Sequence, residues 1–256
     1  MKIPRNRRTA IIGGGVAVIA GAATVIGVSL RQAPEKGAVE KPASAYAVCL
    51  MSELPLIKGA DKRCYKPEAL AALEDAPVIG GDGEAASVAL SSPTDASAPT
   101  KDASTCREYN QLTNEGWYAM TAADMRREDY FKRACGTLVL LGEARAPEAT
   151  YFENGELSEG DVRSLAQTAK FRIGPEEAPE AAPVVAKDEG SAWRITTGEQ
   201  VAIIQPIAHA DFNADGRGDM LVFVAMRIEG GTATASEIGL VEKAGEDGPV
   251  TFEAKD

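Results

Sequence analysis

The sequence predicts an α+β protein in which a disulfide-tied helical unit packs on a small antiparallel β-meander, behind an N-terminal transmembrane helix. Three observations predict this architecture. Residues 10–30 contain no charged side chain. Residues 105–173 carry apolar residues at helical spacing between capping residues. Residues 191–256 alternate β-branched runs with glycine-containing turns, and the 256-residue length allows one or two domains with a sizeable core.

Composition and charge exclude several classes of function. The net charge of −11 argues against nucleic-acid binding, which needs a basic surface. The single histidine leaves no histidine cluster for a metalloenzyme and few routes to a Ser-His-Asp triad. Aromatic residues make up only 5% of the chain, so we expect a core that is mainly aliphatic.

The N-terminal residues predict a membrane-targeting segment. Residues 1–9 form a basic cytoplasmic tail, and residues 10–30 form a transmembrane helix, because roughly 20 apolar residues cross a bilayer and the basic side stays inside. Gly-Val-Ser at 27–29 would also permit cleavage, so a secreted or periplasmic protein released from its signal peptide is the alternative. Residues 31–45 form a stalk. Both alternatives place the remaining chain outside the cytoplasm.

The four cysteines are expected to form two disulfides, because disulfides persist outside the cytoplasm. Four cysteines allow three connectivities. The shortest loops favour Cys49–Cys64 and Cys106–Cys135. Metal binding is the alternative for these residues, but no pair has the C-x-x-C spacing of a zinc site.

The segments between these features divide the chain further. Residues 46–75 contain the first cysteine pair and a short helix that begins at Lys66-Pro67-Glu68, because proline suits a first helical turn. Residues 76–104 are small and polar without periodicity, which predicts a flexible linker. Residues 174–190 are rich in proline, glutamate and alanine, which predicts another linker or a long surface loop.

Residues 105–173 predict a unit of three helices. Ser104 or Thr105 can cap the first helix, Thr121-Ala122-Ala123-Asp124 matches a capping box for the second, and Ser158 begins a third that ends near Thr168. On one face the second helix gathers apolar residues, namely Met125, Phe131, Cys135, Leu138 and Leu141. Cys135 on this face can reach Cys106 and join the first two helices.

Residues 191–256 predict an antiparallel unit of about four strands. The expected strands are 200–208, 220–228, 236–242 and 250–253, which are rich in valine, isoleucine and phenylalanine. Pro206 in the first of them predicts an edge position or a bulge, because proline cannot donate to a β-ladder.

The stretch from Asp211 to Asp219 carries the most specific pattern. It places oxygen-bearing side chains at loop positions 1, 3, 5 and 9 and a glycine, Gly216, at position 6, where a calcium loop turns sharply. The predicted Ca²⁺ ligands are Asp211, Asn213, Asp215, the Arg217 carbonyl and Asp219. Ca²⁺ is favoured over Mg²⁺, which demands a tighter octahedral geometry. The alternative is a metal-free turn between strands.

The sequence around this loop, IAHADFNADGRGDMLVFV, resembles the FG-GAP/VCBS calcium loop of integrin-like β-propeller blades, over residues 201–226. In that family the loop joins two strands of a blade and binds Ca²⁺, so the resemblance implies the same ligand roles for the residues named above. Propellers repeat the motif several times, whereas this chain contains it once. The resemblance therefore implies a single blade-like sheet packed on helices.

Together these features predict an extracytoplasmic, membrane-anchored calcium-binding protein with a binding or scaffolding role in the cell envelope. An envelope protein or a glycan is the expected partner, and no catalytic residue is assigned. The chain has no G-x-S-x-G, P-loop or H-E-x-x-H motif. Two alternatives stay open: an envelope hydrolase acting through paired carboxylates, and an inhibitor or partner of another envelope protein.

Overall fold

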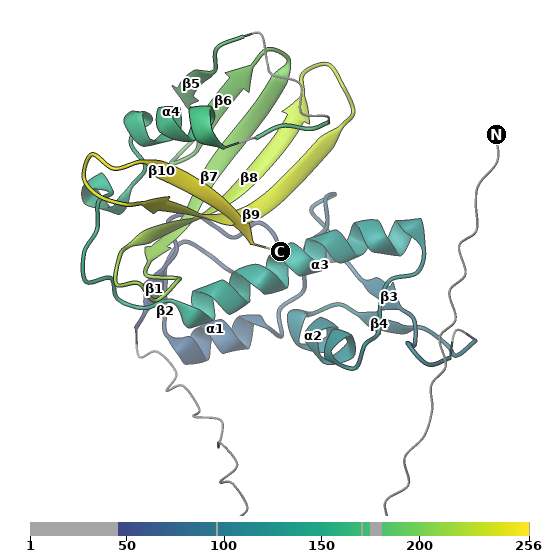
Figure 1. Cartoon of the computed structure of the whole chain (residues 1–256). Helices are drawn as coiled ribbons and strands as arrows, with labels where there is room; N and C mark the ends of the chain where they lie inside the picture. Colours follow the sequence, from purple (N-terminus) through teal and green to yellow (C-terminus); the bar gives the residue numbers. More distant parts are fainter. Residues whose placement is uncertain (1–45, 96, 170, 175–180, 256) are drawn as a thin grey trace, which may run out of the picture. The chain divides into compact units, whose positions relative to one another are not determined.

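The computed structural model describes residues 46–95, 97–169, 171–174 and 181–255. The largest feature of these residues is a six-stranded antiparallel sheet with strand order β10-β9-β8-β7-β6-β5 (Figure 1). The strands of this sheet are β5 (Val184–Lys187), β6 (Trp193–Thr197), β7 (Gln200–Ala210), β8 (Asp219–Ile228), β9 (Thr234–Lys243) and β10 (Val250–Lys255).

The described residues are mostly β, so the predicted α+β class with a small meander was wrong. The four expected strands correspond to β7–β10, but the sheet has two more. The strand β5 lies inside the predicted linker 174–190, where only Val185 among its residues is partly buried. An edge strand of this kind shows little alternation between apolar and polar residues, which explains why the sequence pattern did not reveal it.

Pro206 lies within β7, which is a central strand rather than an edge. The pairing of β7 with β8 shifts register between Pro206 and Ala208. The expected bulge is thus present, and it accommodates a residue that has no N–H to donate.

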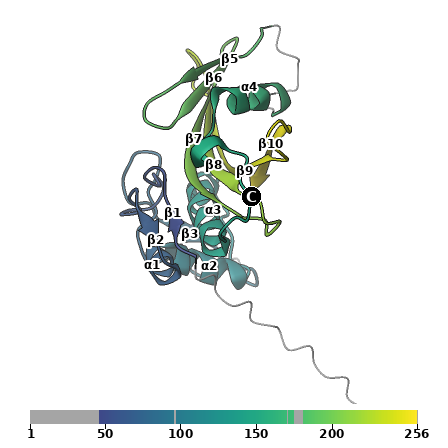
Figure 2. The same cartoon turned by 90° about the vertical axis from the view of Figure 1, so that its left-hand side faces the viewer.

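The two faces of the sheet are covered differently, as strand alternation requires. On β8, Met220, Val222 and Val224 face a core cluster that contains Val162 and Leu165 of α4 (Glu159–Thr168). The helix α4 lies between the outer strands β5 and β10 (Figure 2). The intervening residues of β8 face the other side, towards α3.

A second core cluster joins α3 (Ala122–Glu143) to this other face of the sheet. Phe131 and Leu138 of α3 are buried in the same cluster as Leu221 of β8 and Ile238 and Leu240 of β9. Figure 1 shows α3 beside α1 (Pro67–Leu73) and α2 (Cys106–Asn114), below the sheet in that view. The core of the protein is therefore divided between two clusters on opposite faces of one sheet.

The helices begin where their capping residues predict. Thr105 and Glu108 form a reciprocal capping box on α2, and Ser158 and Asp161 form another on α4. The hydroxyl of Thr121 accepts the Asp124 N–H at the start of α3. These side chains satisfy backbone donors that have no partner within the helix. A short 3₁₀ turn, Glu153–Gly155, precedes α4.

Residues 76–104 are not the flexible linker that their composition predicts. They contain the hairpin of β3 (Val88–Leu90) and β4 (Lys101–Ala103), and they place Val78, Val88 and Leu90 in the core at no measurable exposure. A few well-placed apolar residues are sufficient here, because the hairpin packs on α3. The remaining pair of short strands is β1 (Val48–Cys49) with β2 (Cys64–Tyr65).

The membrane prediction requires correction. No helix in the described part of the chain is long and apolar enough to span a bilayer. The basic tail 1–9, the apolar segment 10–30 and the stalk 31–45 lie outside the described residues. The structure therefore gives no support to the membrane anchor, to the released form or to the location inferred from them.

Candidate functional site

The nine-residue loop from Asp211 to Asp219 joins β7 to β8, as expected for a strand–loop–strand unit. Its two terminal carboxylates are buried, with Asp211 at 4% and Asp219 at 2% exposure. Gly216 has φ +84°, a left-handed conformation that favours glycine at the sharp turn of the loop.

Hydrogen bonds to the loop backbone occupy the buried carboxylates. Asp211 Oδ1 accepts the Ala214 N–H at 2.7 Å, and its Oδ2 accepts the Gly216 N–H at 3.2 Å. Asp219 Oδ2 accepts the Phe212 N–H at 3.1 Å. These contacts let the two aspartates hold the loop closed by side-chain bonds to its own amides.

The two exposed polar side chains of the loop do not point towards a shared cation position, because each one contacts another side chain. The Asn213 amide donates to Glu242 Oε1 at 3.1 Å. Asp215 forms an ion pair with the guanidinium of Arg217. The Arg217 hydrogen bond holds the pKa of Asp215 below its ordinary value, and that of Arg217 is raised by the same contact.

The metal-binding and calcium-binding properties predicted for this loop are corrected, whereas the ligand roles of its residues stay a prediction. Within the described residues, no three His, Cys, Asp or Glu side chains are grouped so that they could hold a metal ion. The physical reason lies in the contacts above, which direct Asp215 to Arg217 and Asn213 to Glu242. The structure thus gives no support for metal-binding or calcium-binding as properties of this chain.

Asp219 is the electrostatically unusual residue of the loop. Burial raises its pKa to about 7, and the nearby acidic groups of Glu242, Asp215 and Asp211 act in the same direction. The Phe212 N–H opposes this rise only in part. An acidic group with such a pKa is partly protonated near neutral pH, which makes the loop sensitive to pH.

Both predicted disulfides are confirmed. Cys49 is bonded to Cys64, and Cys106 is bonded to Cys135. The second bond joins the first residue of α2 to the middle of α3, and the Tyr109 and Phe131 rings pack next to each other between the same two helices, 5.5 Å apart. This bond and ring contact fix α3 against α2.

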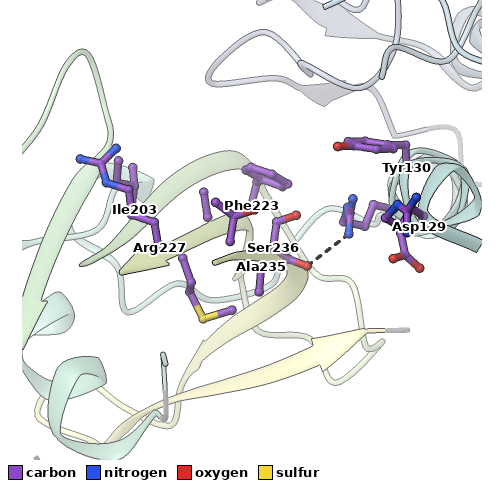
Figure 3. Close-up of a pocket in the computed structure, with 12 residues that line it drawn as sticks. Asp129, Tyr130, Ile203, Phe223, Arg227, Ala235 and Ser236 are labelled. Atoms are coloured by element: carbon purple, nitrogen blue, oxygen red, sulfur yellow. Dashed lines mark hydrogen bonds between the residues drawn. The ribbon is translucent and has the colours of Figure 1, made fainter. Parts of the chain in front are cut away.

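A cavity of about 710 Å³ lies between the first half of α3 and the part of the sheet face that α3 leaves uncovered (Figure 3). The helix lines it with Arg126, Asp129, Tyr130 and Arg133. The strands line it mainly with Ile203, Phe223, Ala225, Met226, Arg227 and Ala235. Side chains alternate between the two faces of β8, so Leu221, Phe223, Ala225 and Arg227 share one face. The helix α3 covers Leu221, and the next three residues lie farther from that contact and line the cavity.

Arg133 occupies a special position in this cavity. Its Nη1 donates to the Ser236 carbonyl at 3.5 Å, drawn as the dashed line in Figure 3, and its guanidinium lies 5.0 Å from the centre of the Tyr130 ring. Its Nε is buried, and no acceptor among the described residues takes its hydrogen. Burial lowers the pKa of Arg133, while the negative charge of Asp129 raises it. A guanidinium nevertheless remains charged at neutral pH.

The cavity has an excess of positive charge. Arg126, Arg133 and Arg227 line it together with one carboxylate, that of Asp129. Among the described residues none of these arginines forms an ion pair, in contrast to Arg107, Arg163 and Arg194 elsewhere on the surface. The cavity is therefore positively charged, although the whole chain has a net charge of −11.

Comparison with known protein families, with curated proteins and with solved structures found no match. The resemblance of residues 201–226 to the FG-GAP/VCBS loop therefore stays a prediction from the sequence. The sequence alone does not predict the arginine-lined cavity, because its walls come from residues 126–133 and 203–236. A signal was present in the basic residues of the second predicted helix, Arg126, Arg127, Lys132 and Arg133, but nothing in the pattern placed them opposite a sheet.

Proposed function

We propose that this chain is a binding protein for an anionic ligand, held in the cavity between α3 and strands β7–β9. One observation carries the proposal: the buried Nε of Arg133 has no acceptor among the described residues. A buried donor without a partner costs about 1–3 kcal/mol. An anionic ligand in the cavity would draw the guanidinium towards it, supply the missing acceptor and remove that cost.

The chemistry of the cavity supports an anion in particular. Guanidinium groups present N–H donors in a planar fork that matches the oxygens of a carboxylate, sulfonate or phosphate. The three arginines lining the cavity form no ion pair within the described part of the chain, so their charge can act on a ligand. The Tyr130 ring beneath Arg133 orients the guanidinium, as cation–π contacts do.

The remaining lining supports a ligand that also has an apolar part. Ile203, Phe223, Ala225 and Ala235 form an apolar floor on the sheet side. Small-molecule sites combine such apolar walls with a few polar groups in a cleft of about 300–1,000 Å³. The volume of about 710 Å³ falls in this range.

The same lining argues against the alternative of a hydrolase with paired acids in this cavity. Such enzymes place two carboxylates on either side of the scissile bond. Among the described residues that line the cavity, Asp129 is the only carboxylate. Binding is therefore the function that the cavity supports best.

The test uses two dyes that share a ring system. We expect anilinonaphthalene sulfonate, which is anionic, to bind the folded protein at one saturable site, and neutral phenylnaphthylamine to bind about tenfold more weakly or worse. A charge-assisted hydrogen bond is worth about 1.5–3 kcal/mol, which is about tenfold or more in affinity. Fluorescence titration measures both constants. Arg227→Gln should weaken sulfonate binding about tenfold by the same argument, and Arg227 is exposed, so the variant should fold.

Arg163→Gln is the matched control. Arg163 is exposed on α4, pairs with Glu159 on the same helix and does not line the cavity described above, so its loss should leave dye binding unchanged. Equal affinity for the two dyes, or sulfonate binding that survives both Arg227→Gln and Arg133→Gln, would overturn the proposed function.

A further inference from the structure

We infer that the ligand is a single-chain anionic amphiphile, with its head group at the arginines and its alkyl chain along α3 from Arg133 towards Leu140. This inference rests on the proposed function and specifies the class of ligand. It starts from the observation that the arginine-lined cavity does not end at Arg133.

Two further cavities continue past this residue. One of about 200 Å³ and another of about 430 Å³ are both lined by Arg133, Lys132, Ile238, Ala254 and Lys255. The larger extends along α3 to Leu140. Leu140 follows Arg133 by seven positions in the helix, which corresponds to about 10 Å along the helix axis. Arg133 thus lies at the junction between the arginine-lined cavity and a groove formed by these two cavities, and the groove is long enough for an alkyl chain of medium length.

The charges along this path are arranged as an amphiphile requires. The basic side chains beyond Arg133 are neutralised by the protein itself, since Lys132 pairs with Glu128 at 3.1 Å and Lys255 pairs with Glu253 at 2.7 Å. The arginine-lined cavity holds the cations that have no such partner in the described residues. An anionic head group is therefore attracted to one end of the path only.

The far end of the path offers apolar surface. Val139 is 54% exposed on α3, and it lines the larger of the two cavities. Leu140 is partly buried beside it, while Ile238 forms the sheet side. An alkyl chain lying here would remove this surface from water, which is the main source of affinity for such chains.

Displacement of anilinonaphthalene sulfonate by hexanoate and by dodecanoate tests the inference. Each fully buried methylene strengthens binding about threefold to fourfold. Because the groove is open, we expect partial burial and a dodecanoate affinity at least about 30-fold above that of hexanoate.

A pair of valine variants separates this site from general hydrophobic binding. Val139→Gln should weaken dodecanoate about fivefold and leave hexanoate and the dye unchanged. Val184→Gln is the matched control, because Val184 is 65% exposed on β5 and lines none of these three cavities. The proposed position of the alkyl chain is overturned if dodecanoate binds no more tightly than hexanoate. It is also overturned if Val139→Gln leaves the affinity for dodecanoate unchanged. Failure of the dye and both carboxylates to bind would instead overturn the proposed function.

Discussion

Replacing Cys106 and Cys135 together by alanine is expected to lower the free energy of unfolding by about 4 kcal/mol. The disulfide closes a loop with a sequence separation of 29 residues, and it stabilises the fold by about 3–4 kcal/mol because it reduces the conformational entropy of the unfolded chain. Both cysteines are buried in the core cluster, at 0% and 3% exposure, so lost packing adds to the effect. Urea denaturation of the double variant against the wild type measures the difference.

The other disulfide provides the matched comparison. Cys49 and Cys64 are exposed and close a loop with a separation of 15 residues, so their double alanine variant should lose about 3 kcal/mol with little packing cost. A smaller loss for Cys106 and Cys135 than for this pair would contradict the role of α2 in supporting α3. So would native protein whose four thiols titrate freely.

Asp219→Asn is expected to stabilise the protein above neutral pH by up to about 4 kcal/mol. The pKa of Asp219 is raised from 3.8 to about 7 in the folded protein, and each unit corresponds to about 1.4 kcal/mol. Below pH 3.8 both states hold the proton and the residue has no effect. As pH rises to about 7, the unfolded chain ionises freely while burial resists ionisation in the folded protein. Stability is therefore lost over this window and stays reduced above it.

Asparagine keeps an oxygen that can accept the Phe212 N–H, so the variant should retain the loop. Urea denaturation at about pH 4 and about pH 8 measures the gain, which should be present only at the higher pH. Asp247→Asn, in the exposed turn between β9 and β10, is the control and should show no such difference. A less stable Asp219→Asn variant, together with a melting temperature that rises with added calcium, would contradict this account.

Local features of the fold could be predicted from the sequence because they depend on residues close together in the chain. Thr105, Thr121 and Ser158 cap the helices as expected, since a cap needs only a hydroxyl next to the free N–H groups. The strands β7–β10 follow from runs of β-branched residues. The connectivity of the two disulfides followed from loop length.

The errors concern features that depend on packing between distant segments. Composition suggested a linker over 76–104, yet Val88 and Leu90 are buried because α3 passes beside them. Spacing in the Asp211–Asp219 loop suggested a cation, but the partners of Asn213 and Asp215 are Glu242, from β9, and Arg217. The cavity likewise depends on α3 facing the sheet, which no local pattern contains.

The most direct test of the proposed ligand site observes the side chain on which it depends. In ¹⁵N NMR spectra, the Nε–H signal of Arg133 should shift in a saturable manner as dodecanoate is added, because the carboxylate supplies an acceptor to a donor that lacks one among the described residues. The Nε–H signal of Arg163 should stay in place. An Arg133 signal that does not move while dodecanoate binds elsewhere would contradict the account.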